Sequence, residues 1–177
     1  MIKLEKFEKP DFDRLISWVD SEKFMFQFAG PIFHFPITNE QLELYISDKD
    51  RYAFKVIFLE TGEVIGHSEI YNSGNNVTKL CRILLGDKNF RGKGLGKEMV
   101  EKLAEFSFNN LLSTTIELNV VNWNTSAIKC YEKVGFVINP LKTSTTQFKN
   151  EEWISYNMIL DKVEWGKNKN SNPFLSV

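Results

Sequence analysis

The stretch Asp87-Lys-Asn-Phe-Arg91-Gly-Lys-Gly94-Leu-Gly96-Lys-Glu-Met99 decides the fold, because it places glycines and basic residues between two segments of different periodicity. The run from Val77 to Leu85 before it predicts a strand. The apolar residues after Leu95 recur at three- and four-residue spacing, which is typical of an amphipathic helix. Glycines let a ligand approach the backbone, and the first N–H groups of a helix have no acceptor within it. With the helix dipole, this turn predicts a site for phosphate or pyrophosphate.

Neither of two common nucleotide motifs fits this turn. A dinucleotide fingerprint needs G-x-G-x-x-G, whereas Gly92, Gly94 and Gly96 are each separated by a single residue. A P-loop needs Gly-Lys followed by Ser or Thr, whereas Gly92-Lys93 is followed by Gly94. From the glycines alone, a tight turn with solvated lysines remains an alternative interpretation.

Two motifs together resemble the GNAT acyltransferase superfamily. Arg91-Gly-Lys-Gly94-Leu-Gly96 matches that family's [Q/R]-x-x-G-x-[G/A] loop. Asn124-Thr-Ser-Ala127-Ile-Lys-Cys-Tyr131-Glu-Lys-Val-Gly135-Phe136 resembles its second signature, N-x-x-A-x-x-x-Y-x-x-x-G-F. Both motifs occur in the family's order and in its strand–helix context. The resemblance covers residues 1–160 and is similar to the branch with ribosomal-protein N-terminal, spermidine and some aminoglycoside acetyltransferases.

The resemblance implies an α/β (α+β) fold, with a GNAT-like mixed, mostly antiparallel central sheet of about 6–7 strands flanked by about 4 helices. Alternation predicts strands at residues 2–7, 52–59, 64–71, 77–85, 114–121, 136–138 and 153–160. Helical spacing and caps predict helices that start near Phe12, Thr38, Leu95 and Asn124. We expect residues 1–165 to form a single GNAT domain and the polar residues 166–177 to form a mobile tail.

The same resemblance implies acetyl-CoA as the co-substrate. Backbone N–H groups of the turn would hold its pyrophosphate at the helix N-terminus. The strand before the turn would splay from the strand 114–121, and pantetheine would pair with its exposed edge. Asn124 would fix pantetheine, or would serve only as the N-cap of its helix. The residues assigned to this binding site are Ile83, Leu84, Leu85, Arg91, Gly92, Lys93, Gly94, Leu95, Gly96, Lys97, Asn119 and Asn124.

The resemblance also assigns catalytic groups. Tyr131 matches the general acid, which donates a proton to the departing thiolate. The backbone N–H of Leu84 would donate to the thioester carbonyl and stabilise the developing oxyanion.

The general base is where this chain departs from the family. Relatives carry an acid at the position of Asn119 or within the segment that is Leu80-Cys81-Arg82 here, and neither is acidic in this sequence. Glu69 and Glu117 are the remaining candidates, although we expect both to face solvent. His67 titrates in the right range but is more often structural on a strand. A water chain would serve in place of these side chains.

The composition excludes several classes of protein. Lys and Arg total 22 against 23 Asp and Glu, so net charge gives no reason to expect a nucleic-acid partner. No apolar run approaches the ~18 residues of a membrane span, so we expect a cytoplasmic protein without membrane contact. Cys81, Cys130, His34 and His67 lack metal-ligand spacing, so no metal site is expected.

These points lead to one functional hypothesis and two alternatives. The resemblance implies an N-acetyltransferase that transfers acetyl from acetyl-CoA to a primary amine, by direct attack in a ternary complex. The acceptor would be a small-molecule amine or a protein N-terminus, and a homodimer would fit the family. The phenylalanines between Phe24 and Phe35 either pack in the core or line a pocket for a small apolar group. The alternatives are a non-catalytic acyl-CoA-binding sensor or partner subunit, and a mononucleotide-phosphate enzyme.

Overall fold

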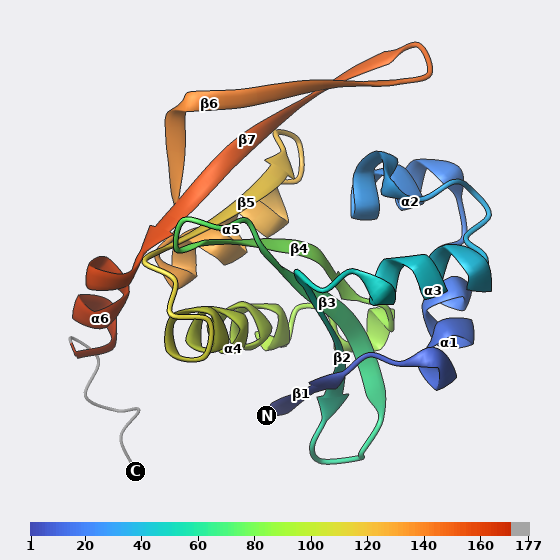
Figure 1. Ribbon diagram of the computed structural model, residues 1–177, viewed down its shortest axis with the longest axis horizontal. Coiled ribbons are helices and arrows are strands. Elements are labelled where there is room, and N and C mark those ends of the chain that lie inside the picture. Colours follow the sequence, from blue (N-terminus) through green and yellow to red (C-terminus); the bar gives the residue numbers. More distant parts are fainter. Residues whose placement is uncertain (171–177) are drawn as a thin grey trace.

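A seven-stranded sheet forms the centre of the molecule, with its strands in the order β1-β2-β3-β4-β5-β7-β6 (Figure 1). The computed structural model describes residues 1–170, and their side chains up to residue 167. Neighbouring strands are antiparallel except β4 and β5, which run parallel. The strands are β1 (Ile2–Lys6), β2 (Arg51–Phe58), β3 (Val64–Asn72), β4 (Val77–Leu85), β5 (Thr115–Val121), β6 (Val137–Phe148) and β7 (Glu151–Asp161). The α-helices in this part of the chain are α1 (Phe12–Trp18), α2 (Glu22–Ala29), α3 (Asn39–Ser47), α4 (Leu95–Asn109), α5 (Thr125–Val134) and α6 (Lys162–Asn170).

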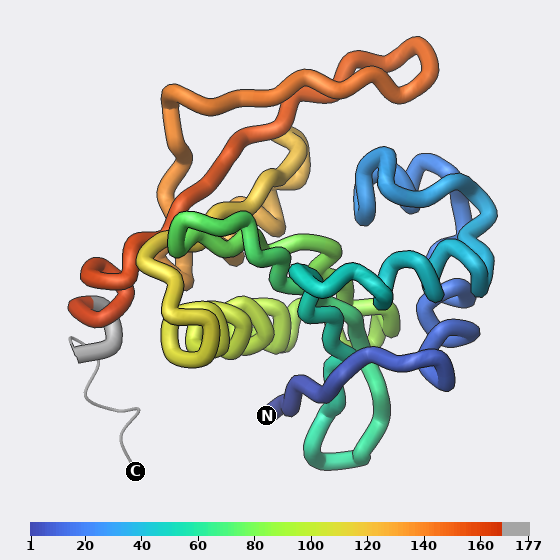
Figure 2. The backbone as a smooth tube through the Cα atoms, viewed as in Figure 1, coloured from blue at the N-terminus to red at the C-terminus, as the bar shows by residue number. Residues whose placement is uncertain are grey.

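The sheet separates two apolar cores. On one face, α4 buries Met99 and Leu103 against strand residues such as Ile116 and Met158. On the other face, α1, α2 and α3 form a second core that includes Phe12 from α1. The tube in Figure 2 shows the N-terminal helices beside the central strands, with the long β6–β7 hairpin extending above them. The apolar face of α4 thus covers one face of the sheet, and the N-terminal helices cover the other.

The expected sheet is confirmed, and six α-helices flank it within the described residues instead of about four. The sequence patterns do not predict α2 or α6. In α2, Met25 and Ala29 are buried in the core, whereas Phe24 and Phe28 are only half-buried. Phe24, Met25, Phe28 and Ala29 recur at helical spacing and form one apolar stripe, whereas Phe26 packs against Phe148 and Trp153 of the hairpin.

The C-terminal strands extend well beyond the predicted residues 136–138 and 153–160. β6 has 12 residues and most of them are exposed, so it carries no alternation between apolar and polar positions that would reveal a strand. β6 also forms one edge of the sheet. The hairpin is therefore held by its backbone ladder and by β7, whose Trp153 and Met158 are buried.

The helix α6 follows β7 and includes the first residues of the segment 166–177 that we expect to be a tail. Trp165 of this helix is buried and packs near Phe108, with ring centroids 6.2 Å apart. Residues 171–177 lie outside the described residues, so the expectation for them stays a prediction. Among the described helices, none has both the length and the apolar character needed to cross a membrane.

The packing of α4 makes a testable prediction. Leu103 is fully buried between α4 and the sheet, so Leu103→Ala should lower the free energy of unfolding by about 2–5 kcal/mol through lost contacts and a new cavity. Urea denaturation followed by circular dichroism measures this change. Lys102→Ala, at the neighbouring half-buried position, should change the same quantity by about 0.5 kcal/mol or less. Equal losses in the two variants would contradict this packing.

Candidate active site

The strands β4 and β5 are paired only along their first halves. Val77–Leu80 pairs with Thr115–Leu118, and the pairing ends there. On the other side of β4, the register with β3 shifts between His67 and Glu69, which leaves an extra residue in β4. Arg82 lies in this bulge with a φ of 48°. Because a bulge bends the strand that contains it, the second half of β4 turns away from β5 and leaves a gap.

A buried ion-pair cluster holds the bulge. The side chain of Glu69 is fully buried, and its two oxygens accept hydrogen bonds from Nε and Nη2 of Arg82. Glu69 Oε1 also accepts from Arg51 Nη1 at 2.5 Å, and Oε2 accepts from Tyr45 Oη at 2.5 Å. A positive φ is uncommon for a residue with a side chain. The bidentate pair therefore stabilises Arg82 in a conformation that it would rarely adopt alone.

Glu69 is consequently unsuited to the role of general base. Burial raises the pKa of this carboxyl, but the hydrogen bonds and charges of Arg82 and Arg51 outweigh burial and hold the pKa below its ordinary value. The expectation that Glu69 faces solvent is wrong, since its side chain is fully buried. Burial also lowers the pKa of His67 to about 3. His67 is therefore a neutral structural residue, with Nε2 3.0 Å from Tyr45 Oη.

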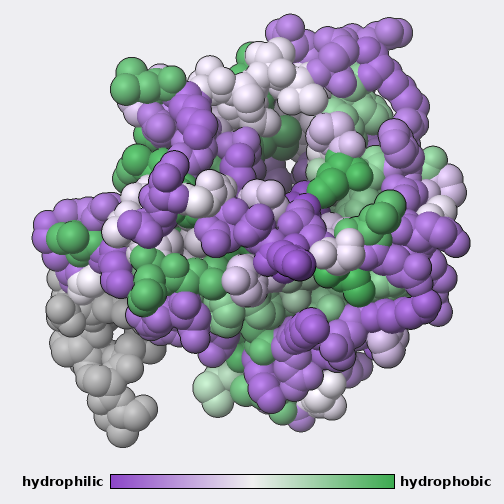
Figure 3. All heavy atoms as spheres, in the orientation of Figure 1, coloured by the Kyte–Doolittle hydropathy of each residue, from purple (hydrophilic) through white to green (hydrophobic). Residues whose placement is uncertain are grey.

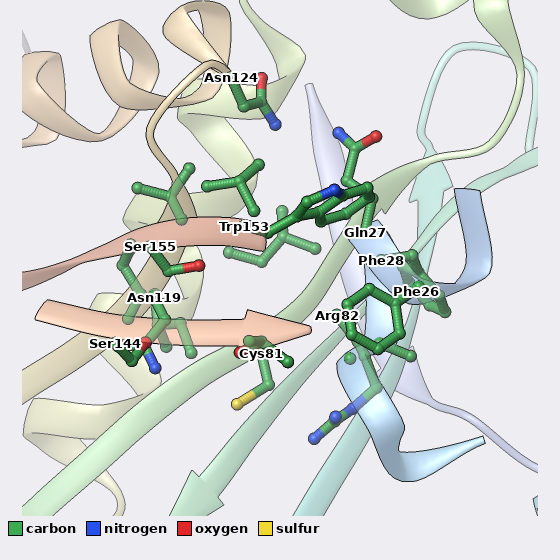
Figure 4. A pocket seen from close by; sticks show the side chains of 18 of the residues that line it. Phe26, Gln27, Phe28, Cys81, Arg82, Asn119, Asn124, Ser144, Trp153 and Ser155 are labelled. Atoms are coloured by element: carbon green, nitrogen blue, oxygen red, sulfur yellow. The ribbon is translucent and has the colours of Figure 1, made fainter. Parts of the chain in front are cut away.

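A cavity of about 380 Å³ lies beside this gap. Its walls come from residues 79–84 of β4, residues 118–121 of β5, α5, α2 and the β6–β7 hairpin. The space-filling view shows an opening between the hairpin and the N-terminal helices (Figure 3). Figure 4 shows Phe26 of α2 and Trp153 of β7 at this site, where their rings meet edge to face at 5.4 Å.

The glycine-rich turn follows β4 and presents unpaired backbone donors. Gly94 is the N-cap of α4, with a φ of 81° and no capping side chain. Within the described residues, the amide N–H groups of residues 92–97 donate to no carbonyl or side chain, whereas the next amide, that of Glu98, donates to the Gly94 carbonyl. Unpaired N–H groups at a helix N-terminus favour an anion. The predicted phosphate-binding turn therefore has the required donors.

Arg91, Lys93 and Lys97 have different environments. Arg91 donates from Nε and Nη2 to the Leu85 carbonyl at 3.2 and 2.9 Å, so it braces the turn against the end of β4. Lys97 forms an ion pair with Glu101 at 2.6 Å. Lys93 lies over the ring of Phe90, 5.5 Å from its centroid, and has no ion-pair partner among the described residues. Of these three cations, Lys93 is therefore the one that is available to a phosphate.

The backbone of β4 presents the N–H of Leu85, and not that of Leu84, to the gap. The Leu84 carbonyl faces β3, since its oxygen occupies the space that a side chain at Gly66 would need. The Leu85 carbonyl faces the other way, because it accepts from Arg91. The N–H and C=O of one strand residue point to the same side, and successive residues alternate. The oxyanion donor expected at Leu84 is therefore better assigned to Leu85.

The second motif contributes two side chains to the same cavity. Tyr131 lines it from α5, and burial raises the pKa of its hydroxyl, which keeps the phenol protonated. Asn124 also lines it and caps α5, with Oδ1 accepting from the Ala127 N–H at 3.3 Å. The capping interpretation of Asn124 is thus confirmed, and its amide nitrogen remains available to a ligand. Asn119 lines the cavity from β5 and accepts from Asn157 at 3.1 Å.

The cavity wall formed by α2 and the β6–β7 hairpin is rich in aromatic side chains. Phe24, Phe26 and Phe28 line the cavity, whereas Phe33 packs in the core. Phe35 belongs to neither group, since it is exposed and does not line the cavity. The hairpin side chains of the cavity are not predicted from the sequence, because the exposed Ser/Thr pattern of β6 gives no signal. These side chains are Ser144, Thr146, Trp153 and Ser155.

Comparison with known proteins identifies the family. The model of the acetyltransferase (GNAT) family matches residues 13–136 of the chain. The chain belongs to the GNAT acetyltransferase family. The match includes both motifs, the splayed strands and the helices α4 and α5.

Curated relatives of this GNAT chain match over shorter stretches. An uncharacterised N-acetyltransferase of the SPbeta prophage of Bacillus subtilis is 24% identical over 106 residues, which are 59% of this chain and 60% of the relative. An aminoglycoside N(6′)-acetyltransferase of Klebsiella pneumoniae is 43% identical over 53 residues, which are 30% of this chain and 26% of the relative. N-acetylaspartate synthetase of Xenopus tropicalis is 34% identical over 96 residues, 54% of this chain and 34% of the relative. The matches thus span between about a quarter and three fifths of these relatives.

Solved structures share the GNAT fold over nearly the whole chain. Spermidine N-acetyltransferase from Vibrio cholerae, in complex with CoA and spermine, aligns with a TM-score of 0.78 at 20% identity, covering 93% of this chain and 97% of that one. An aminoglycoside acetyltransferase in complex with coenzyme A aligns with a TM-score of 0.73 at 22% identity, covering 96% and 99%. At such identities the likeness establishes the fold.

The cluster around Glu69 predicts a specific dependence of stability on charge and pH. Glu69→Gln leaves two buried guanidinium groups without their counter-charge, so the free energy of unfolding at pH 7 should fall by about 3–5 kcal/mol. Glu60→Gln, at an exposed position in the β2–β3 turn, should leave it nearly unchanged. Urea denaturation of both variants and the wild type measures these differences.

The pH dependence follows from the lowered pKa of Glu69. A carboxyl with a lowered folded-state pKa contributes stability above its unfolded pKa of about 4.3, and that contribution is lost as the pH falls. The difference in the free energy of unfolding between wild type and Glu69→Gln should therefore become smaller below about pH 4. A difference in the free energy of unfolding that stays constant down to pH 3 would show that the carboxylate charge does not stabilise the bulge.

Proposed function

We propose that this protein is an N-acetyltransferase that transfers acetyl from acetyl-CoA to a primary amine by direct attack in a ternary complex. The observation that carries the proposal is the gap between β4 and β5, which opens beside a turn with unpaired amides and leads to a cavity lined by Tyr131. Membership of the GNAT family supports the acetyl donor. The names of the relatives support an amine as acceptor, since they include spermidine and aminoglycoside acetyltransferases.

The chain offers groups that fit the donor along its length. The amides of residues 92–97 and the Lys93 ammonium would hold the pyrophosphate. The edge of β4 in the gap would pair with the pantetheine amides, and the Asn124 amide nitrogen would donate to them. The N–H of Leu85 would donate to the thioester carbonyl and stabilise negative charge on its oxygen. The thioester supplies the acetyl group in its reactive form.

The remaining chemistry is the transfer of two protons. As the amine nitrogen bonds to the carbonyl carbon, the carbon–sulfur bond breaks and the sulfur takes the electron pair. The Tyr131 hydroxyl, kept protonated by its raised pKa, would donate its proton to that sulfur. No Asp or Glu lines the cavity within the described residues, so we propose that water carries the amine proton to solvent. Glu117 is bound to Lys142 at 2.6 Å and is not a lining residue.

The lack of a lining carboxylate also favours one alternative, a non-catalytic sensor that binds acyl-CoA. The two functions differ in turnover. Incubation with acetyl-CoA and a panel of primary amines, followed by a colorimetric assay of free thiol, separates them. Amine-dependent thiol release supports the enzyme, and binding of acetyl-CoA without release to any amine supports the sensor.

The proton donor can be tested by one substitution. Tyr131→Phe removes the hydroxyl and keeps the ring that packs near Phe136, so kcat should fall about 100-fold or more while the Kd for acetyl-CoA changes little. Tyr52→Phe, whose ring packs near Phe106 outside the cavity, should retain wild-type kcat. Steady-state kinetics and calorimetry give the two quantities. An unchanged kcat in Tyr131→Phe would exclude this residue as the acid.

A further inference from the structure

We propose that the acceptor amine carries a carboxylate on an aromatic or apolar body, and that Lys79 binds this carboxylate. The inference rests on the proposed function, because it concerns the acceptor side of the same cavity. It separates this chain from its structural neighbours, which bind polycations such as spermine and kanamycin. An amino acid or a related amine with one carboxylate has the required chemistry.

The charge of the cavity disfavours a polycation. In the described part of the chain, two charged side chains line the cavity, Lys79 and Arg82, and both are cations. A polyamine would place further ammonium groups beside these cations, with no lining carboxylate to receive them. Like charges brought together in a partly desolvated site repel, and the interaction costs affinity.

Four carboxylates on elements around the cavity form ion pairs with cations of the chain. A second ammonium group of a substrate would have to compete with these cations for the carboxylates. These pairs come from several elements around the acceptor side, namely Glu22 with Lys149 at 2.5 Å, Glu117 with Lys142 at 2.6 Å, Glu151 with Lys23 at 2.9 Å, and Glu69 with Arg82.

Lys79 is the lining cation that forms no ion pair among the described residues. Its neighbour Leu80 points into the core beneath α4, so strand alternation turns Lys79 toward the opposite face, which forms the cavity floor. No carboxylate among the described residues lies within 4.0 Å of its ammonium group, although the charge of Lys79 acts, with the stronger contacts of Lys142 and Asn157, to lower the pKa of the facing Glu117. Arg82 is instead committed to Glu69. An anionic group of the substrate would therefore find its partner at Lys79.

The opposite wall is aromatic. Phe24, Phe26 and Phe28 from α2 and Trp153 from β7 line it, and Figure 4 shows Phe26, Phe28 and Trp153 around the cavity. The Trp153 ring already has a cation nearby, because Lys23 Nζ lies 5.7 Å from its centroid. These rings bury an apolar or aromatic body well. Together with Lys79, these rings complement an acceptor that has one acidic and one apolar part.

The test compares matched amines on matched variants. The amines are L-phenylalanine, L-phenylalaninamide, which lacks the carboxylate, and spermidine. The proteins are the wild type, Lys79→Met, which keeps side-chain length without charge, and Lys102→Met on α4, away from the cavity, as control. Thiol release gives kcat/KM for each pair. For each protein, kcat/KM with phenylalanine is divided by kcat/KM with phenylalaninamide. The two amines differ in pKa, but this difference affects the ratio equally in every protein.

We expect Lys79→Met to lower this ratio by about tenfold or more, with phenylalaninamide turnover nearly unchanged and Lys102→Met like the wild type. An unchanged ratio in Lys79→Met overturns the inference. So does a wild-type enzyme that prefers spermidine to phenylalanine, although that result leaves the proposed acetyl transfer standing. The absence of thiol release with every amine overturns the proposed function, and the inference falls with it.

Discussion

The ion pair between Glu69 and Arg82 is the interaction on which the arrangement of the site depends. It lies in the middle of the sheet, where a charge is costly unless its partner is at hand. Here the partner stabilises a backbone conformation that arginine rarely adopts, and that conformation bends β4. Without the bend, β4 and β5 would pair along their whole length and no gap would exist for a ligand. Glu69, which does not line the cavity, thus determines the position of the strand that does.

The bend also sets the direction of the backbone donors. Once β4 leaves β5, the edge that faced its neighbour presents N–H and C=O groups without partners, and Arg91 fixes the last of these carbonyls. The turn that follows continues the row of unpaired donors into the N-terminus of α4. A long ligand with amides at one end and a diphosphate at the other complements such a row.

The sequence is sufficient for those parts of the site that depend on local geometry. The glycine-rich turn, the N-cap Asn124 and the placement of Tyr131 on α5 follow from spacing within one strand–helix unit, and the structure has these elements where the pattern predicts them. The family resemblance rests on the same residues. Their geometry is short-range, so a single sequence reveals it.

The parts that depend on contacts across the sheet are not visible in the sequence. Glu69 reads as an exposed strand carboxylate, because nothing in its neighbourhood along the chain indicates that Arg51 and Arg82 converge on it. The proposed oxyanion donor moves from Leu84 to Leu85 for a similar reason, since a bulge changes which amide faces the gap. The acceptor wall joins α2 to a hairpin more than a hundred residues away, and Lys79 gains its significance from that assembly.

The central claim is that the parted strands and the unpaired amides of residues 92–97 bind coenzyme A. Isothermal titration calorimetry of coenzyme A into the folded full-length chain tests it most directly, with ATP titrated in parallel. The account predicts saturable heat for one molecule of coenzyme A per chain, with a Kd on the order of 1 µM to 1 mM, and no comparable heat with ATP. The absence of saturable heat with coenzyme A, or tight binding of ATP alone, would contradict it.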